Sequence, residues 1–186
     1  LCFVYAFQTN EELQTAVDLL VSDYPAALST YGLIRYWDVS LITDMEELFR
    51  YKTTFNDDIS DWDVSNVTNM RDMFFGASIF NQDLSSWDVS SVNVMTNMFY
   101  GTNALSDEIK CAIHTSFSNQ NGYWSYDWSD LCFVYAFQTN EELQTAVDLW
   151  ISDNSTALST YGYILYWDVS LITDMSDLFK DKTTFN

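Results

Sequence analysis

Three cysteines are the most reactive side chains in this 186-residue chain, and their spacing suggests a disulfide. Cys2 and Cys132 occupy the same position in two copies of one sequence, and Cys111 lies 21 residues before Cys132. We therefore expect a Cys111–Cys132 disulfide, with Cys2 paired to an equivalent cysteine upstream. Such a bridge indicates an oxidising compartment. The alternatives are buried free thiols or a reactive nucleophile, but a single histidine gives a cysteine-protease arrangement little support.

His114 is that single histidine, and it lies on a predicted helix beside apolar residues. A metal site or a catalytic triad would need partners that the surrounding spacing does not supply. The sequence has no His-Glu-x-x-His, no Gly-x-Ser-x-Gly and no glycine-rich phosphate loop, and only five glycines. We expect His114 to be a hydrogen-bonded structural residue, and we predict no catalytic residue and no cofactor.

One aspartate follows the tryptophan in every copy of a short motif, Trp-Asp-Val-Ser. These aspartates are Asp38, Asp63, Asp88 and Asp168. Carboxylates stacked about 5 Å apart repel each other unless donors or cations lie between them. The row could therefore bind a metal cation or a partner, and Ca²⁺ could screen the acidic surface. No Asp-x-Asp-x-Asp-Gly loop is present, and we favour hydrogen bonds from the nearby serines and from the backbone.

Two Asn-x-Ser/Thr sequons, at Asn66 and Asn154, could carry N-linked glycans. Asn154 replaces Tyr24 of the first copy within a loop-like Ser-Asp-Asn-Ser-Thr stretch, and it is the better candidate. Asn66 follows the Trp-Asp-Val-Ser motif on a more regular surface, where Thr68 is a predicted helix cap. Such tripeptides often arise by chance, so glycosylation at either position stays a hypothesis.

The composition makes two classes of partner unfavourable. The chain has 27 acidic and 7 basic residues, which give a net charge of −20. A surface this acidic repels nucleic acid and anionic lipid. No run of 18 apolar residues is present, so we expect no direct membrane insertion in this window.

Residues 1–56 recur as residues 131–186, with 45 of 56 positions identical, which defines a long period of 130 residues. Internal repetition of this kind is typical of tandem arrays. We interpret the chain as about one and a half units of such an array, and we expect the natural chain to be much longer.

A short period of 25 residues lies inside the long one. The Trp-Asp-Val-Ser motif begins at Trp37, Trp62 and Trp87, and again at Trp167, and these tryptophans are the predicted core ladder. Aligning on the motif predicts three coils with matching apolar positions. They are Ile34, Trp37, Val39, Ile42, Met45, Leu48, Phe49 and Phe55 in the first coil; Ile59, Trp62, Val64, Val67, Met70, Met73, Phe74 and Phe80 in the second; and Leu84, Trp87, Val89, Val92, Met95, Met98, Phe99 and Leu105 in the third.

The spacing within a coil predicts a strand and a helix. The first four apolar positions have the 1-4-6-9 spacing of a leucine-rich repeat, and alternation around Trp62 and Val64 predicts a short parallel strand. Met70, Met73 and Phe74 have helical spacing. The predicted fold class is therefore an α/β repeat, a leucine-rich-repeat-like solenoid of 25-residue coils with helical capping segments.

Cap residues at both ends of each helical turn complete this prediction. Thr43, Thr68 and Asn93 are expected N-caps, with a Thr43–Glu46 capping box. Gly76 and Gly101 follow the turns, where a left-handed conformation is expected.

The remaining residues of each long period are expected to cap the stack. A helix opened by Thr9, with a capping box to Glu12, would place Leu13, Ala16, Val17, Leu20 and Val21 over the first coil. Ser106 is expected to cap a second helix, with Ile109, Ala112, Ile113 and Phe117 on one face. The predicted organisation is an N-terminal cap at 1–33, three coils at 34–108, a C-terminal helical and aromatic cap at 109–130, and a truncated next unit at 131–186.

The repeat Trp-Asp-Val-Ser-x-Val-Thr-x-Met-x-x-Met-Phe, followed by Phe-Asn-Gln-Asp-Leu-Ser, resembles that of BspA-like leucine-rich-repeat surface proteins, in particular the eukaryotic marine-type members. The resemblance is strongest over 37–105 and 167–186. It implies an extracellular or cell-surface location and a role in adhesion or assembly without catalysis. Ile42, Val67 and Val92 replace the ninth-position asparagine of the general leucine-rich pattern, so we expect Asn56 and Asn81, at the opposite bend, to supply an asparagine ladder.

Two functions follow from the repetition. The leading prediction is a non-enzymatic structural protein of an extracellular filament, sheath, or flagellar or cell-surface appendage, whose partners are copies of itself or other surface-filament proteins. The alternative is an adhesin that binds a glycan or a protein through the strand face or the aromatic loops. Near-identity of the two copies favours the first, because a binding module would vary its exposed positions.

Overall fold

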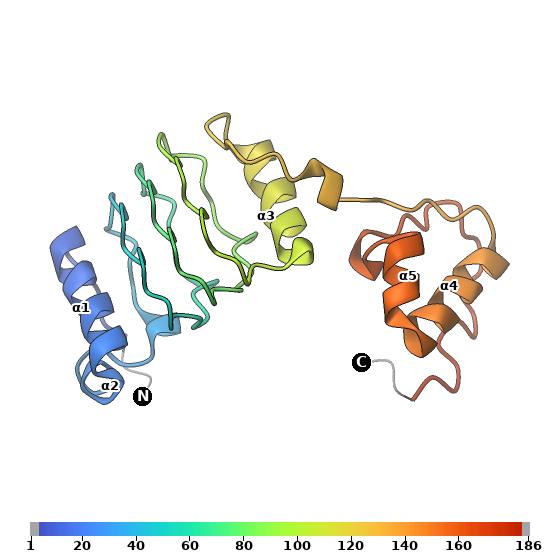
Figure 1. Cartoon of the computed structure of the whole chain (residues 1–186), viewed down its shortest axis with the longest axis horizontal. Coiled ribbons are helices and arrows are strands. Elements are labelled where there is room, and N and C mark those ends of the chain that lie inside the picture. The colour runs from blue at the N-terminus through green and yellow to red at the C-terminus, as the bar shows by residue number, and fades with distance from the viewer. Residues whose placement is uncertain (1–3, 184–186) are drawn as a thin grey trace. The chain divides into compact units, whose positions relative to one another are not determined.

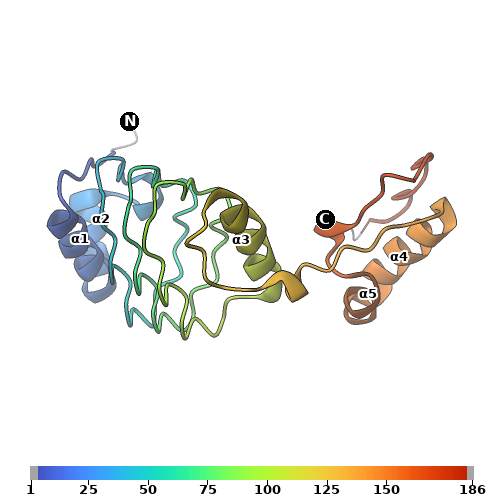
Figure 2. The same ribbon diagram turned by 90° about the horizontal axis from the view of Figure 1, so that it is seen from above.

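The computed structural model describes residues 4–183, which form two compact units, Leu1–Trp128 and Ser129–Asn186. In the first unit, α1 (Asn10–Ser22) and α2 (Tyr24–Tyr31) precede three coils, and α3 (Asp107–Gln120) follows them. Figure 1 shows the coils stacked between α1 and α3, and Figure 2 shows the same stack from above. The second unit contains α4 (Asn140–Ser152) and α5 (Asn154–Tyr161). Short 3₁₀ turns lie at Ile34–Tyr36, Ser129–Leu131 and Ile164–Tyr166.

All the predicted core positions of the three coils are buried, which confirms the 25-residue register. Rings at equivalent positions stack from coil to coil: Phe49 and Phe74 have centroids 5.3 Å apart and planes 2° apart, and Phe74 and Phe99 repeat this at 5.5 Å and 3°. Trp37 and Trp62 stack at 6.4 Å. Each large side chain stabilises the fold by roughly 1.5–3 kcal/mol when buried, so the stacked rings contribute to the stability of the coils together with the aliphatic core residues.

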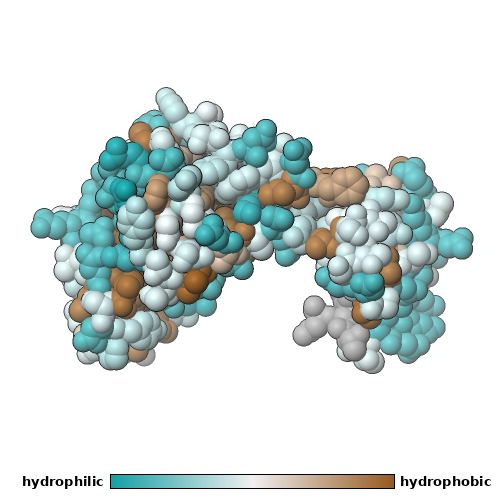
Figure 3. Space-filling view, in the orientation of Figure 1, coloured by the Kyte–Doolittle hydropathy of each residue, from teal (hydrophilic) through white to brown (hydrophobic). Residues whose placement is uncertain are grey.

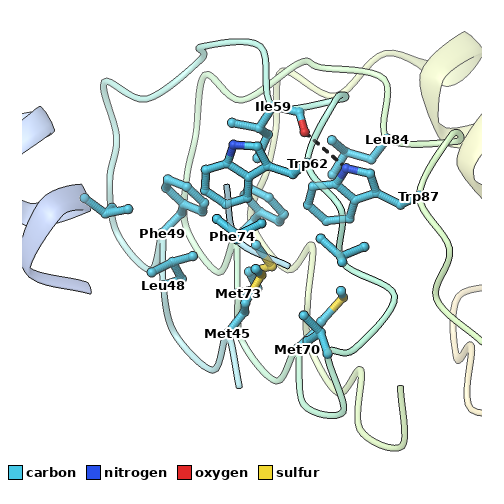
Figure 4. Packing of buried hydrophobic residues seen from close by; sticks show 14 of the residues in the cluster. Met45, Leu48, Phe49, Ile59, Trp62, Met70, Met73, Phe74, Leu84 and Trp87 are labelled. Carbon is cyan, nitrogen blue, oxygen red and sulfur yellow. Dashed lines mark hydrogen bonds between the residues drawn. The ribbon is translucent and has the colours of Figure 1, made fainter. Parts of the chain in front are cut away.

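The tryptophan side chains also link neighbouring coils through hydrogen bonds. The indole N–H of Trp62 donates to the carbonyl of Ile34 at 2.9 Å, and that of Trp87 donates to the carbonyl of Ile59 at 3.1 Å. Figure 4 shows the second of these bonds within the packed interior. Each indole therefore packs in its own coil and satisfies a buried backbone acceptor of the coil before it.

The predicted fold class is wrong, because residues 4–183 contain no strand and no sheet. Coil-to-coil bridges are isolated, parallel and single-residue, and they join Asp44 to Asn69 and Asn69 to Val94. The Trp-Asp-Val-Ser segments use their amides locally instead. The amide of Ser65 donates to the Asp63 carboxylate at 3.1 Å. Short polar side chains compete with a strand ladder for backbone groups, and here the Asp63 carboxylate takes the amide of Ser65.

The helical turn predicted in each coil is likewise absent from the described residues. Asp72 and Gly76 have φ values of +53° and +69°, and Asn97 and Gly101 repeat them at +55° and +78°. A right-handed helix cannot contain such left-handed residues. The glycines thus adopt the expected conformation, but they follow no helix.

Alternate amides of this same segment donate to the next coil. The first coil donates through the amides of Met45, Glu47, Phe49 and Tyr51 to the carbonyls of Asn69, Arg71, Met73 and Phe75, at 2.8–3.0 Å. The predicted Thr43 and Thr68 helix caps are therefore also wrong. The Thr43 carbonyl accepts the amide of Thr68 at 2.8 Å and its hydroxyl at 3.0 Å. Side-chain spacing alone does not distinguish this winding segment from a helix.

The asparagine ladder predicted at the opposite bend is confirmed. Asn56 Oδ1 accepts the amide of Asn81 at 2.7 Å, and Asn81 Oδ1 accepts the amide of Ser106 at 2.8 Å. Each asparagine therefore satisfies a backbone donor of the following coil.

Helical caps cover both ends of the stack, as predicted. Thr9 caps α1 through the amide of Glu12, and Ser106 caps α3 through the amide of Ile109. Of the predicted α1 stripe, Val21 is 37% exposed and does not contribute to the core. The helix α2 was not predicted; Pro25 lies in its first turn, where a missing amide costs nothing.

The C-terminal cap replaces the contacts that a fourth coil would make. The hydroxyl of Tyr126 accepts the amide of Phe99 at 2.8 Å, the position at which Phe74 donates to a coil carbonyl. Asn121 is buried and donates to the carbonyls of Val89 and Val92 at 2.6 and 2.7 Å. Side chains of the C-terminal cap therefore form the hydrogen bonds to the third coil that the backbone of a further coil would form.

Candidate interaction surface

The Trp-Asp-Val-Ser aspartates are held by serines, as the hydrogen-bonding interpretation predicted. Asp88 Oδ1 accepts the Ser90 amide at 3.0 Å and the Ser90 hydroxyl at 2.6 Å. Asp38 and Asp168 accept the amides of Ser40 and Ser170 at 3.0 and 2.9 Å. Each carboxylate accepts a hydrogen bond from the serine two residues later and so stabilises the turn in which it lies. The row therefore has a structural role in the coils.

These donors also affect the acid–base behaviour of the row. The Ser40 and Ser90 side chains, followed by their amides, hold the pKa of Asp38 and of Asp88 below its usual range. The same donors of Ser170, its amide first, lower the pKa of Asp168. Within residues 4–183, no group of three or more His, Cys, Asp or Glu side chains is placed to hold a metal ion.

An exposed aromatic row crosses the three coils on their outer surface. Tyr51 and Tyr100 are 61% and 62% exposed, and Phe75 lies between them. The Phe75 ring is 5.4 Å from Tyr51, edge on, and 5.0 Å from Tyr100, stacked. The Arg50 guanidinium lies over Tyr51 and Phe75 at 5.2 and 5.0 Å. This row combines apolar area with a cation and could contact a glycan or a protein.

The sequence prediction missed this row, although a signal was present. Phe75 and Tyr100 directly follow the core residues Phe74 and Phe99. In both pairs the first aromatic is buried in the core, whereas Phe75 is only partly buried and Tyr100 is exposed. The Tyr51 ring packs closely against the backbone of Gly76, since a Cβ on Gly76 would lie 2.7 Å from that ring.

A groove of about 360 Å³ lies between α1 and the first coil. Its lining includes Glu11 of α1 and Asp44 and Glu46 of the coil. The carboxylate of Glu46 is already bound by Asn69 at 2.8 Å and by Arg71. The groove is acidic and would exclude anions, but its charges also serve the contact between the first two coils.

His114 has the structural role predicted for it. Its Nδ1 accepts the indole N–H of Trp124 at 3.1 Å and lies 3.2 Å from the carbonyl of Tyr126. Cys111 and Cys132 are both disulfide-bonded. Cys2 lies outside the described residues, so its pairing stays a prediction.

The two sequons lie in different settings. Asn66 is exposed, but its side-chain amide donates to the carbonyl of Ser40 at 2.8 Å. Asn154 is exposed at the first position of α5, which Asp153 caps, and not in a loop as expected. The amide nitrogen that would carry a glycan is thus engaged at Asn66, and Asn154 stays the better candidate.

Comparison with known proteins places the repeat in a family. A family model described as "Mycoplasma protein of unknown function, DUF285" matches residues 24–128 and 131–186. Searches of curated proteins and of solved structures found no match. None of the helices in residues 4–183 is both long enough and apolar enough to span a bilayer.

Proposed function

Because the chain belongs to the family described as Mycoplasma protein of unknown function, DUF285, a family of BspA-like surface repeats, we propose that it is a non-enzymatic structural protein of an extracellular filament, sheath or cell-surface appendage. The length of such an assembly would come from repetition of the 130-residue unit. Its partners would be copies of itself or other surface-filament proteins.

The observation that carries the proposal is that the two copies build the same local structure. Both pair the segment before the first helix with the first coil, through Phe7 to Asp38 and through Phe137 to Asp168, each at 3.0 Å. Both tie that helix to the coil with an ion pair, Lys52 to Asp18 and Lys182 to Asp148. An array of equal modules produces a uniform assembly, whereas a set of binding modules would diversify.

The residues that could do chemistry have structural partners, which supports the non-enzymatic assignment. His114 is bound by Trp124, and the aspartates of the Trp-Asp-Val-Ser motif are bound by serines. The net charge of −20 argues against nucleic acid as a partner and favours a protein that stays soluble outside the cell.

The aromatic row Tyr51–Phe75–Tyr100 favours a second candidate, an adhesin that binds a glycan or a protein. Tyr51 and Tyr100 are exposed in the first unit, and Phe75 is partly buried between them. The second copy has Asp181 where the first has Tyr51, so the row is not a general feature of every first coil. Such variation at an exposed position is what a binding module would show.

Electron microscopy of the native protein, purified from its source, tests the leading proposal. A structural subunit should appear as filaments or sheets with a regular axial repeat. Dispersed single particles at all concentrations, together with glycan-array binding that Tyr51→Ala and Tyr100→Ala abolish, would favour the adhesin. Tyr123→Ala, which also removes an exposed tyrosine but lies off the row, is the matched control.

A further inference from the structure

One backbone donor of the third coil is left without a partner beside the aromatic row. In the second coil the amide of Gly76 donates to the carbonyl of Tyr100 at 2.8 Å. The equivalent amide of Gly101 has no acceptor within residues 4–183. The C-terminal cap supplies the Tyr126 hydroxyl to the nearby amide of Phe99, at 2.8 Å, but it supplies no acceptor to Gly101. The Gly101 amide is therefore a donor that a ligand could use.

The surface over Gly101 leaves room for such a ligand. A Cβ on Gly101 would meet only the backbone of Gly76, at 3.4 and 3.5 Å. At Gly76 the equivalent space is filled, because the Tyr51 ring lies 2.7 Å from the place of a Cβ. A glycine that no side chain covers permits a ligand to approach the backbone closely. The amide of Gly101 can thus be reached at hydrogen-bonding distance.

The Tyr100 ring next to this amide adds an apolar surface. Phe75 stacks on one face of the ring, with centroids 5.0 Å apart and planes 24° apart. Tyr100 is nevertheless 62% exposed, so its exposed area lies on the other face and at the edges. A flat ring placed on that face would continue the stack of Phe75 and Tyr100.

A second polar group lies in the same turn. The amide of Tyr100 donates to the carbonyl of Asn97 at 3.0 Å, which closes the turn. The Asn97 side chain is exposed and has no hydrogen-bond partner in the part of the chain that the structure describes. A carboxamide both donates and accepts hydrogen bonds, as a hydroxyl group does. The corner therefore combines an aromatic face with a fixed backbone donor and an adaptable side chain.

We infer that Tyr100, Gly101 and Asn97 form a binding site for a pyranose ring of a neutral glycan. The C–H face of the sugar stacks on Tyr100, one hydroxyl oxygen accepts the Gly101 amide, and another hydroxyl binds the Asn97 side chain. The inference rests on the second candidate function, because it names the class of ligand that the aromatic row binds.

A protein partner is less favoured because the apolar surface is small. A fully buried aromatic side chain covers about 150–250 Å². The exposed parts of Tyr51, Phe75 and Tyr100 therefore provide on the order of 300 Å². A stable protein–protein interface needs about 800 Å² on each partner. A short oligosaccharide can be bound on the smaller area.

Charge favours a neutral glycan over an anionic one. The chain carries a net charge of −20, which repels anionic ligands. Arg50 lies over the Phe75 ring, but it is paired with Glu47 and lies 3.4 Å from the Asp72 carboxylate. Its charge is thus already compensated within the coils. Uronic-acid and sulfated sugars gain no cation here and are repelled by the rest of the surface.

NMR titration of the 186-residue chain with cellohexaose, laminarihexaose and mannohexaose tests the inference. At least one of these neutral saccharides should shift the Gly101 amide signal and, at saturation, slow its hydrogen exchange by about tenfold, because the donor gains a partner. The amide of Gly122, in the turn after α3, is the matched control and should not respond. A Gly101 amide that responds to none of the three saccharides would overturn the inference.

Tyr100→Ala should weaken saccharide binding by about tenfold or more, as expected when an aromatic residue at the centre of a contact is truncated. The fold should be retained, since the ring is exposed. Tyr123→Ala removes an equally exposed tyrosine away from the row and should bind as the native chain does. Binding that Tyr100→Ala leaves unchanged would support a glycan-binding adhesin but overturn this site.

Two further measurements distinguish the other occupants. Oligogalacturonate should bind at least about tenfold more weakly than the best neutral saccharide at low ionic strength, where repulsion is least screened. Tighter binding of this anionic sugar would overturn the neutral assignment. Shifts of the Gly101 amide that grow with protein concentration, without saccharide, would identify a second copy as the occupant and also overturn it. Microscopy of assemblies decides the leading proposed function separately, since no saccharide is added there.

Discussion

At the residue scale, residues with left-handed backbone conformations determine the path of each coil. Asp72 and Asn97 adopt this conformation at modest cost, because short polar side chains tolerate it, and Gly76 and Gly101 adopt it without a steric penalty. The first coil instead has Glu47 at φ +59° and Tyr51 at +56°. The Tyr51 ring then lies across Gly76, so the glycine provides both a backbone angle and the room for an aromatic contact.

Gly76→Ala is expected to lower the free energy of unfolding by about 1–2 kcal/mol. An alanine there is strained at φ +69°, and its Cβ would lie 2.7 Å from the Tyr51 ring. Gly122→Ala is the control, since its Cβ would meet nothing within 4 Å. Urea unfolding of both variants measures the difference, and the Tyr51→Ala, Gly76→Ala double variant separates backbone strain from ring contact. Equal stability of the Gly76→Ala and Gly122→Ala variants would contradict the assigned conformation.

Ser90→Ala is expected to raise the pKa of Asp88 towards its usual value, because the Ser90 hydroxyl is the main cause of its lowering. A folded-state pKa below the unfolded value adds stability above the unfolded pKa and loses it as pH falls through the folded one. The Asp88 contribution is therefore lost below about pH 4. Carboxyl NMR titration measures the shift, with Ser78→Ala as a control away from the motif. An unchanged Asp88 pKa would show that the hydroxyl is not the donor that matters.

At the scale of the structural element, the sequence predicts which side chains are buried but not the backbone conformation that buries them. Apolar period identifies inward positions whatever the backbone does, so Trp62, Met70 and Phe74 were placed in the core correctly. Period does not specify backbone conformation, and the spacing of Met70, Met73 and Phe74 fits a helix as well as the segment that forms. Asp72 has a left-handed conformation, which a helix over Met70–Phe74 cannot contain. The Asp63 carboxylate accepts the amide of Ser65 within the segment predicted as a strand. Neither feature changes the apolar pattern.

Surface features were predictable only where a local rule applies. Serine two residues after aspartate is a recurrent turn, so the Asp88–Ser90 contact could be expected from the sequence. The row of Tyr51, Phe75 and Tyr100 forms only because three coils are in register. A hydrophobicity scale would place these aromatic residues in the interior. The pairs Phe74–Phe75 and Phe99–Tyr100 are a signal in the sequence, but the sequence does not show that the second ring of each pair lies at the surface.

Trp62→Ala is expected to cost about 3–5 kcal/mol of unfolding free energy through the cavity that it leaves. Trp62→Phe keeps most of the ring but leaves the Ile34 carbonyl without the indole donor, which should cost about 1–3 kcal/mol. Thermal unfolding of the full chain measures both, with Tyr123→Ala as a control on an exposed ring. A Trp62→Ala protein as stable as the control would mean that the indole does not hold neighbouring coils together.

At the scale of the whole molecule, the 27 acidic side chains far outnumber the 7 basic ones. Figure 3 shows one face of the surface, where hydrophilic residues are mixed with scattered hydrophobic ones. All seven basic residues form ion pairs with acidic side chains, such as Arg35 with Asp61 and Lys52 with Asp18. Most of these pairs are at least partly exposed, so each contributes little to stability. The apolar core and the acidic surface therefore respond to different changes in the solvent.

A change in salt concentration should therefore affect assembly but not the folding of each unit. Like-charged surfaces repel over roughly 30 Å at 0.01 M ionic strength and over only about 8 Å at 0.15 M. Filaments or bundles held by screened or cation-bridged carboxylates should loosen at low ionic strength and with chelators, while each unit stays folded because its core is apolar. Light scattering across the series, with circular dichroism in parallel, measures the two responses. Assemblies indifferent to salt and chelator would instead indicate apolar or covalent end-to-end contacts, and the acidic surface would then serve solubility alone.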